Sequence, residues 1–373
     1  MNFDYTILNK LLDELKNNKC SINGQIFNLE EIEKLGFDKF SQLVHISPKF
    51  KLYKYYPNIN IVNEHGENVN YSIDALRNNE VYLNDSINFD DCFDCAIDID
   101  FNKFNNVRLN KYCEYFKIDT EDINNDNELL ARKISAFLYE KLSNNKENDI
   151  YDSITDEIKK LKAENFVKKL ILEINQTNDF AISLHNILKE EHYEFTQALK
   201  NFKITCFSTS PYLNRMWSDY GNKNKGFCIE YEIDINNEKL FNDIFLNLFP
   251  VIYSQRRNDS NILCEINDDK LNLNNVWQLY FNGMLRKSLY WIDQCEWRLI
   301  LYDKMMDANP IKFYKITKVY FGNKMNIEEK KIIKKICKDK NIKTTCILRE
   351  NNSFNLIECQ NLKKCYLEDE SDN

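Results

Sequence analysis

Glycine is scarce in this sequence. There are seven glycines among 373 residues, about 2%, where a typical globular protein has about 7%. None of them falls in a G-x-G-x-x-G or a G-x-x-x-x-G-K-[ST] pattern. The glycine-rich loops that hold phosphates in standard Rossmann and P-loop proteins are therefore excluded. A nucleotide bound by this chain would have to be held by side chains.

The sequence also lacks a basic surplus and the spacing of a metal site. Lysine and arginine total 50 against 58 acidic residues, a net charge of −8, so a general affinity for nucleic acid is not expected. Among twelve cysteines, Cys92 and Cys95 form the only C-x-x-C pair, and the four histidines show no H-x-x-x-H pattern. We therefore expect this pair to be reduced, buried thiols and expect no bound metal.

Long apolar runs are missing as well. No segment approaches the ~20 apolar residues of a membrane helix, and the start, MNFDYTILNK, lacks the basic and apolar regions of a signal peptide. With 43% hydrophobic and 13% aromatic residues the composition is that of a folded globular chain. We expect a cytoplasmic protein that does not interact with membranes.

Hydrophobic spacing predicts an α+β fold. Strand-like and helix-like segments are mixed and several strands follow one another, which favours a mixed or antiparallel sheet over a doubly wound parallel one. The predicted parts are an N-terminal helical preface (1–48, with helices at 4–17 and 29–45), the first part of the core (49–106), a large helical insertion (107–200), the second part of the core (201–360) and an acidic tail (361–373). In the first part we predict a strand at 50–56 and a short helix that begins at Ser72. In the second we predict a strand at 226–233 and helices near 213–220, 270–289 and 326–338.

The segment 291–300, WIDQCEWRLI, predicts a strand with an unusual face. Side chains alternate along a strand, so Gln294, Glu296 and Arg298 share one side and Trp291 lies on the other, which is mostly apolar. Two interpretations are open. The three polar side chains are solvated, or the strand is central and they line a cleft or a hydrogen-bonded network.

Two other segments carry polar side chains at turns. Ser208 and Ser210 follow a predicted strand and precede the predicted helix at 213–220; they either cap that helix or position a ligand. No histidine is near them in the sequence, which disfavours a serine-hydrolase triad. Asp90, Asp91 and Asp94 either bind a divalent cation or cap a turn, and capping is favoured because further ligands are missing.

An ordered set of motifs resembles a bacterial family catalogued as Domain of Unknown Function 2971. The motifs are LYKYY, FDDCFD, CFSTSPYLNRMWSDYGNKNKGFCIEY, EWRLI and VYFGNKM. In that family L-Y-K-Y-R is followed by F-N-D-P-F-D, C-F-S, M-W-x-x-Y, K-G-F and W-x-x-E-x-E-W-R. The resemblance covers roughly residues 50–325. Tyr56 stands where the family has arginine, and Gln294 where it often has glutamate.

The same pattern more distantly resembles the core of ADP-ribosyltransferases, which carry S-T-S on a middle strand and [QE]-x-E on a late strand. Ser208-Thr209-Ser210 and Gln294-Cys295-Glu296 match these in order. The resemblance implies that Glu296 stabilises an oxocarbenium-like ion formed from NAD, that Gln294 orients the acceptor, and that Ser208 supports the site. It further implies contacts to NAD, as substrate, from Lys54, Tyr56, Ser210, Trp217, Tyr220 and Arg298, with Lys54 or Arg298 at the pyrophosphate and Trp217 or Tyr220 stacked on nicotinamide.

We therefore expect an ADP-ribosyltransferase or NAD glycohydrolase, suited to a toxin-like or phage-defence effector, with no metal and with a protein or nucleic-acid acceptor that the sequence does not identify. One alternative is a non-catalytic sensor or interaction protein that uses the helical insertion to bind a partner or a second copy. Another is a metal-dependent nuclease or phosphodiesterase that uses Asp90, Asp91, Asp94 and Glu296.

Overall fold

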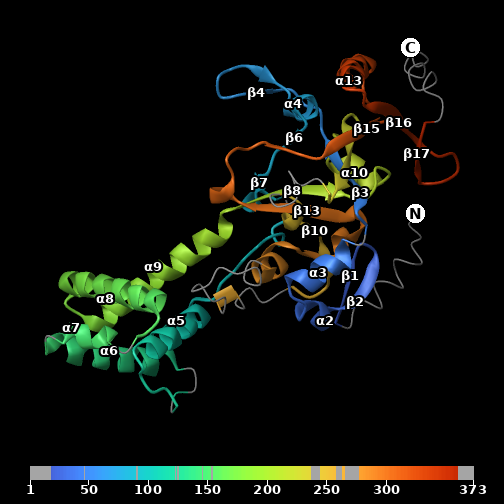
Figure 1. Ribbon diagram of the computed structural model, residues 1–373. Helices are drawn as coiled ribbons and strands as arrows, with labels where there is room; N and C mark the ends of the chain where they lie inside the picture. Colours follow the sequence, from blue (N-terminus) through green and yellow to red (C-terminus); the bar gives the residue numbers. More distant parts are fainter. Residues whose placement is uncertain are drawn as a thin grey trace. The chain divides into compact units, whose positions relative to one another are not determined.

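The computed structural model divides the chain into two compact units (Figure 1). The structure describes residues 18–45, 47–89, 91–121, 123, 126–144, 146–152, 154–236, 244–257, 263–264 and 277–359. The first unit comprises residues 1–95, 202–257 and 285–373, and the second comprises residues 96–201 and 258–284. The helix expected at residues 4–17 lies outside the described residues.

A mixed nine-stranded sheet forms the centre of the first unit and confirms the α+β prediction. Its neighbours are antiparallel except for one parallel pair, β15 and β16. In spatial order the strands are β10 (Leu248–Pro250), β13 (Glu296–Tyr302), β8 (Phe202–Ser208), β3 (Lys49–Tyr56), β9 (Phe227–Asp234), β15 (Lys315–Phe321), β16 (Lys343–Arg349) and β17 (Leu356–Glu358), and β7 (Asn84–Asp85) pairs with β8. Figure 1 shows β3, β8 and β13 side by side, although they come from distant parts of the chain.

A smaller four-stranded sheet supports one end of this unit. Its order is β12 (Arg286–Ser288), β11 (Ile252–Ser254), β1 (Lys19–Ile22) and β2 (Gln25–Asn28). Asn23 and Gly24 join β1 to β2 with φ values of 50° and 77°, and an Asn-Gly pair favours such a tight hairpin turn because both residues tolerate positive φ. Residues 19–28 are thus a hairpin where a helical preface was predicted.

Two predicted helices differ from the structure. The helix expected at 29–45 is two helices, α2 (Leu29–Glu33) and α3 (Phe37–Val44), because the chain is extended at Gly36, with φ −77° and ψ 172°. Within the expected helix at 270–289, the described residues are helical as far as Met284, first α-helical (277–279) and then a π-helical turn (Tyr280–Met284), and strand β12 follows where helix was predicted.

The strand predicted at 291–300 is also shorter than expected. A 3₁₀ helix, η5 (Leu289–Gln294), replaces its first part, and Ser288 caps that helix by accepting a hydrogen bond from the Tyr290 N–H at 3.3 Å. Cys295 is left-handed, with φ 47°, and β13 begins one residue later. Gln294 is therefore not on the strand that carries Glu296.

Helices and two-stranded ribbons cover the rest of the first unit. The helices are α4 (Tyr71–Asn78), α10 (Asn214–Asp219) and α13 (Ile327–Asp339), close to their predicted positions. Short 3₁₀ helices are η1 (Ser86–Asn88), η2 (Phe245–Asn247) and η6 (Asp303–Met305), and the ribbons are β4 (Ile61–Val62) with β5 (Asn68–Val69), and β6 (Glu80–Val81) with β14 (Ile311–Lys312).

Helices make up most of the described part of the second unit. They are α5 (Phe101–Tyr115), α6 (Asn127–Ser143), α7 (Glu147–Tyr151), α8 (Glu157–Thr177) and α9 (Phe180–Lys200). An aspartate caps the start of α5, α6, α8 and α9, because its side chain accepts hydrogen bonds from the first free backbone N–H groups. Their shared core includes Leu109, Ile134, Phe166 and Leu188. Among the described helices none is long and apolar enough to cross a membrane.

Candidate functional site

Glu296 and Arg298 lie on one face at the start of β13. β13 has neighbours on both sides, β8 and β10, and pairs Glu296 with Ser208 and Arg298 with Cys206 of β8. Glu296 is 4% exposed and Arg298 is fully buried. Two charges at a buried position require partners. The interpretation that these side chains are solvated is therefore wrong.

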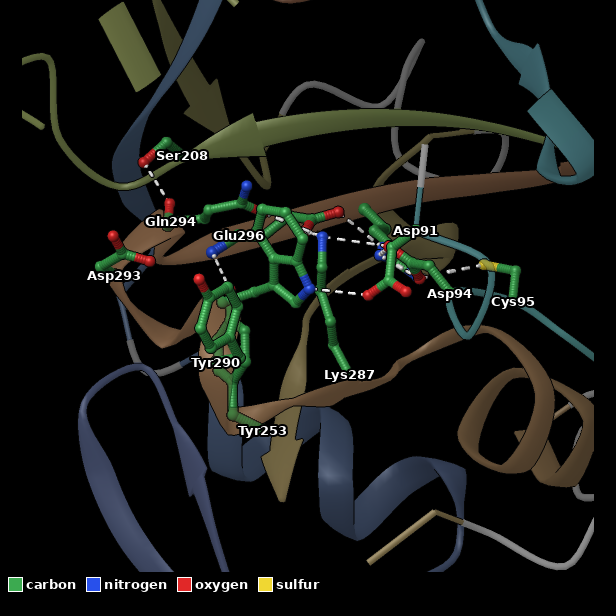
Figure 2. Close-up of polar contacts among 12 residues, drawn as sticks. Asp91, Asp94, Cys95, Ser208, Tyr253, Lys287, Tyr290, Asp293, Gln294 and Glu296 are labelled. Atoms are coloured by element: carbon green, nitrogen blue, oxygen red, sulfur yellow. Dashed lines mark hydrogen bonds and ion pairs between the residues drawn. The ribbon is translucent and has the colours of Figure 1, made fainter. Parts of the chain in front are cut away.

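Their partners are Asp94 and Lys287, and together the four side chains form a closed ring of ion pairs (Figure 2). Arg298 Nε donates to Glu296 Oε1 at 2.7 Å, and its Nη2 lies 2.7 Å from the Asp94 carboxylate. Lys287 Nζ lies 2.7 Å from Glu296 Oε2 and 3.0 Å from Asp94 Oδ2. Each carboxylate thus contacts both cations, and the charges balance.

The ring keeps Glu296 ionised. Burial alone would raise the pKa of this carboxyl, but the charges of Arg298 and Lys287 outweigh burial and hold its pKa well below its usual range. Burial likewise opposes the charge on Lys287, yet Glu296 and Asp94 raise its pKa above the usual value. At neutral pH Glu296, Lys287 and Arg298 are therefore charged.

Strands β11 and β12 of the smaller sheet help to position the ring. Tyr253 on β11 and Lys287 on β12 are register partners in a parallel pair. The Tyr253 hydroxyl accepts a hydrogen bond from the Glu296 N–H at 2.9 Å, and the Val251 N–H donates to the Glu296 carbonyl at 2.9 Å. The backbone N–H and the backbone carbonyl of Glu296 are therefore both hydrogen-bonded.

Gln294 joins the ring although it is not on β13. Its side-chain Oε1 accepts a hydrogen bond from Lys287 Nζ at 2.9 Å, and its Nε2 donates to the Tyr220 hydroxyl at 3.4 Å. Ser208 Oγ donates to the Gln294 carbonyl at 2.7 Å, which Figure 2 also shows. Ser208 therefore supports the backbone of this segment and does not cap α10, whose N-terminus has no side-chain cap.

A pocket of about 370 Å³ opens beside the ring, within the first unit. This volume lies in the ~300–1,000 Å³ range of small-molecule sites. Its walls contain both aromatic and polar side chains. The lining includes Tyr53, Lys54, Tyr82, Asn84, Asn88, Phe89, Asp91, Asp94, Thr205, Cys206, Met216, Asp219, Tyr220, Lys287, Trp291, Gln294 and Glu296.

Lys54 is a second pocket cation and has a different environment from Lys287. Its Nζ donates to Thr205 Oγ1 at 2.7 Å and to the Cys206 carbonyl at 3.1 Å, and it forms no ion pair with a described carboxylate. It also lies 5.4 Å from the centroid of the Phe207 ring. Burial lowers its pKa. An anionic group of a ligand would supply the charged partner that the described residues do not give this ammonium.

The structure brings together only part of the predicted site. Lys54, Tyr220, Gln294 and Glu296 line the pocket, and Arg298 contacts Glu296. The other predicted residues do not belong to the described lining. Tyr56 stacks on Phe227, Ser210 accepts a hydrogen bond from the Tyr212 N–H, Trp217 is fully buried with its indole N–H on the Pro211 carbonyl, and Ser208 lies behind Gln294.

The acidic motif at 89–94 contributes through two of its aspartates. Asp91 Oδ1 accepts from the Phe93 N–H at 2.9 Å, as predicted for a turn cap, and its Oδ2 accepts from the Trp291 indole at 2.6 Å. Asp94 belongs to the ring, and Asp90 lies outside the described residues. No cluster of metal-ligating side chains occurs among the residues described. Neither Cys92 nor Cys95 is in a disulfide, and Cys92 is exposed, contrary to expectation.

Sequence reasoning did not identify Lys287, Tyr253 or Trp291 as site residues. Lys287 was placed within a helix and Trp291 on an apolar strand face, so neither pointed toward Glu296. Asp94 was considered only as a metal ligand or cap. The available signal was the joint presence of the FDDCFD and EWR motifs. The structure pairs Asp94 of the first motif with Arg298 of the second.

Comparison with known proteins supports the family resemblance. The model of the family described as Protein of unknown function (DUF2971) matches residues 216–299. This segment runs from α10 to β13 and contains Tyr220, Lys287, Gln294 and Glu296. It confirms the resemblance over that part of the chain, and the family description names no activity. No curated protein and no solved structure matches the chain.

Proposed function

We propose that the pocket binds NAD and cleaves the bond between nicotinamide and ribose, with transfer of ADP-ribose to an acceptor or to water. One observation carries the proposal. Gln294 and Glu296 share the Lys287 ammonium and both line a pocket with aromatic walls and a second cation, Lys54. A paired amide and carboxylate beside a ligand-sized pocket is the arrangement that the Q-x-E pattern implies.

The chemistry assigns a role to each group. When the C–N bond breaks, its electron pair stays with the nicotinamide nitrogen, and positive charge develops on the ribose carbon and ring oxygen. Ionised Glu296 would accept a hydrogen bond from a ribose hydroxyl and stabilise that charge. The acceptor then adds to the ribose carbon and releases its proton to solvent. Gln294 would orient the acceptor.

The ion pairs of Glu296 leave capacity for a substrate. A carboxylate offers about four acceptor positions on its two oxygens. Arg298 and Lys287 each use one, on different oxygens, and the Cys206 thiol uses a third, which leaves one. The ring therefore fixes the orientation and charge of Glu296 without filling both oxygens. Lys54 would contact the pyrophosphate, since it has no carboxylate partner among the described residues.

The closed ring also favours a second candidate function, ligand binding without turnover. All three N–H donors of Lys287 have acceptors within the protein, Gln294, Glu296 and Asp94. A fully satisfied buried network rigidifies a site, and a sensor needs a rigid pocket but no reactive carboxylate. The metal-dependent reading is less favourable, because both carboxylates already contact two cations.

The test is nicotinamide release. Purified wild-type protein and Glu296→Gln are incubated with NAD, alone and with a cell lysate or nucleic acid as the acceptor source, and nicotinamide is quantified. We expect release by the wild type and a loss of at least about 100-fold in the variant, in the range typical of removing a catalytic acid–base or charge-stabilising group. Binding of NAD without release would support the sensor, and neither binding nor release would refute the proposal that this pocket is an NAD site.

A further inference from the structure

Arg215, on α10, contacts the segment that carries Trp291, although no sequence motif singled it out. Its Nη1 donates to the Tyr290 carbonyl at 3.1 Å and to Asp293 Oδ1 at 3.3 Å. Its guanidinium carbon lies 3.9 Å from the centroid of the Trp291 ring. One side chain thus contacts three residues of η5, the segment that leads into Gln294 and Glu296.

Trp291 is held from its edge as well as from its face. The indole N–H donates to Asp91 Oδ2 at 2.6 Å, and the Lys287 ammonium lies 5.3 Å from the ring centroid. Trp291 is half-buried and lines the pocket beside Phe89 and Tyr220. Its position is therefore set by two cations near the ring, Arg215 and Lys287, and by a carboxylate at the edge. Tryptophan is the aromatic side chain that attracts a cation most strongly.

Guanidinium chemistry suits this double task. The planar group stacks on an aromatic ring while its N–H donors reach a carbonyl and a carboxylate in the same plane. Arg215 is itself held by Asp219, whose Oδ2 accepts from Nε at 3.4 Å, and Asp219 also lines the pocket. A lysine at this position would keep the charge, but it would lose the planar group that packs on the indole and the several N–H donors that a guanidinium holds in fixed directions.

We infer that Arg215 is a positioning residue that fixes the Trp291 indole as a rigid wall of the pocket, against which a flat ring of the ligand packs. It acts through Trp291 and η5 and touches no reacting group. Aromatic rings stack with offset or edge contacts that depend on their mutual angle, so a fixed indole selects planar ligands. The identity of the ring as nicotinamide or adenine rests on the proposed function, whereas the fixed indole does not.

The tryptophans make this wall measurable without a ligand. Of the chain's four, Trp217 and Trp277 are fully buried and Trp297 is 3% exposed, so acrylamide quenching of the intrinsic fluorescence should report mainly on Trp291. Trp291→Phe defines the signal that belongs to Trp291. Arg215→Gln and Arg215→Lys test the clamp, and Arg77→Gln, an exposed arginine of the same unit paired with Asp74, is the matched control.

We expect Arg215→Gln to raise the quenching constant about twofold or more because the indole loses the nearer of its two cations. Arg215→Lys should give a smaller rise, and Arg77→Gln should match the wild type. Far-UV circular dichroism should be unchanged. An unchanged constant in folded Arg215→Gln would overturn the inference. So would a Trp291→Phe protein that is quenched like the wild type. If Arg215→Gln does not fold, Arg215→Lys decides by the same criterion.

The second readout uses turnover. Arg215→Lys should raise KM for NAD several-fold and leave kcat within about twofold, because a positioning residue changes how the substrate ring binds more than how the bond breaks. A fall in kcat at unchanged KM would contradict the inference. If the wild type releases no nicotinamide, the proposed function fails, and the quenching experiment still decides the role of Arg215.

Discussion

Two buried glutamates on the same sheet, Glu296 on β13 and Glu230 on β9, are satisfied in different ways. Glu230 is 3% exposed and Glu296 is 4% exposed. Glu230 accepts hydrogen bonds from the Thr317 hydroxyl at 2.6 Å and the Tyr320 hydroxyl at 2.7 Å, and pairs with Lys51 at 2.8 Å, a side chain that is 53% exposed. Glu296 instead contacts two buried cations and lines a pocket.

The difference distinguishes a structural carboxylate from a candidate functional one. Neutral hydroxyls and a surface lysine are sufficient to bury Glu230, and neither leaves a second charge in the interior. Burying the Glu296 ring requires four desolvated charges, an arrangement that apolar side chains of similar volume often match or exceed in stability. A fold does not need such a ring for stability alone, which is why we assign its function to the pocket beside it.

The largest effect on stability should come from opening the ring. Arg298→Met would leave Asp94 and Glu296 buried with only Lys287, and breaking a buried ion pair from one side destabilises a protein by about 3–5 kcal/mol. Urea denaturation of the variant and the wild type measures the difference. A loss below ~1 kcal/mol would mean that the ring is hydrated and not a closed, buried network.

A smaller loss should follow when Tyr253 is changed to Phe. The Tyr253 hydroxyl is the acceptor for the Glu296 N–H, and an unsatisfied buried donor costs about 1–3 kcal/mol. Chemical denaturation again gives the value. An unchanged free energy of unfolding would show that another acceptor replaces the hydroxyl. The smaller sheet would then not fix Glu296.

The pH dependence should differ in sign between Glu230 and Glu191 of α9. Burial raises the pKa of Glu230, but hydrogen bonds from Lys51, Thr317 and Tyr320 outweigh it, so its pKa is below the ordinary 4.5. Burial raises the pKa of Glu191 above 4.5, although Tyr112 and Arg108 partly oppose it. Glu230 therefore takes up a proton less readily in the folded state than in the unfolded state, and Glu191 takes up a proton more readily in the folded state.

Each glutamate is compared with its own glutamine variant across pH. The stability that Glu230 adds over Glu230→Gln is fully present above 4.5 and should decline as the pH falls below that value. The stability of the wild type relative to Glu191→Gln should instead increase as the pH falls toward 4.5 through the raised pKa. Parallel curves for the two pairs would contradict the assigned environments.

The smallest effect is expected for Lys51→Met. Because Lys51 is half exposed, its ion pair with Glu230 is screened, and pairs of this kind contribute about 0–1 kcal/mol. Thermal denaturation in low and high salt measures it. A loss comparable to that of Arg298→Met would remove the distinction between the two glutamates.

Much of the fold could be read from local patterns, and the site only in part. Residues typical of strands predicted β3, which is rich in aromatics, and β9, and helical signals predicted α4 and α13, since such signals are local. The sequence placed Gln294 and Glu296 on one face of an uninterrupted strand, and in the structure both line the same pocket although only Glu296 is on the strand. The left-handed Cys295 that ends η5 has no strong sequence signature, because positive φ is uncommon for a residue other than glycine.

The missing parts of the site depend on long-range pairing. Lys287 and Tyr253 meet Glu296 because β11 and β12 form a parallel pair, and no local pattern specifies which strands become neighbours. Asp94 reaches Arg298 across 204 positions of sequence. The hairpin at 19–28 was different, since its Asn-Gly turn was a recognisable local signal.

The most direct measurement of the central claim is the rate of nicotinamide release from NAD by two matched variants, Glu296→Gln and Glu230→Gln, beside the wild type. Both substitutions replace a buried carboxylate on the same sheet by its neutral isostere. The account predicts that Glu230→Gln keeps activity within about twofold while Glu296→Gln loses at least about 100-fold. Equal rates for the two variants, whether high or low, would contradict it.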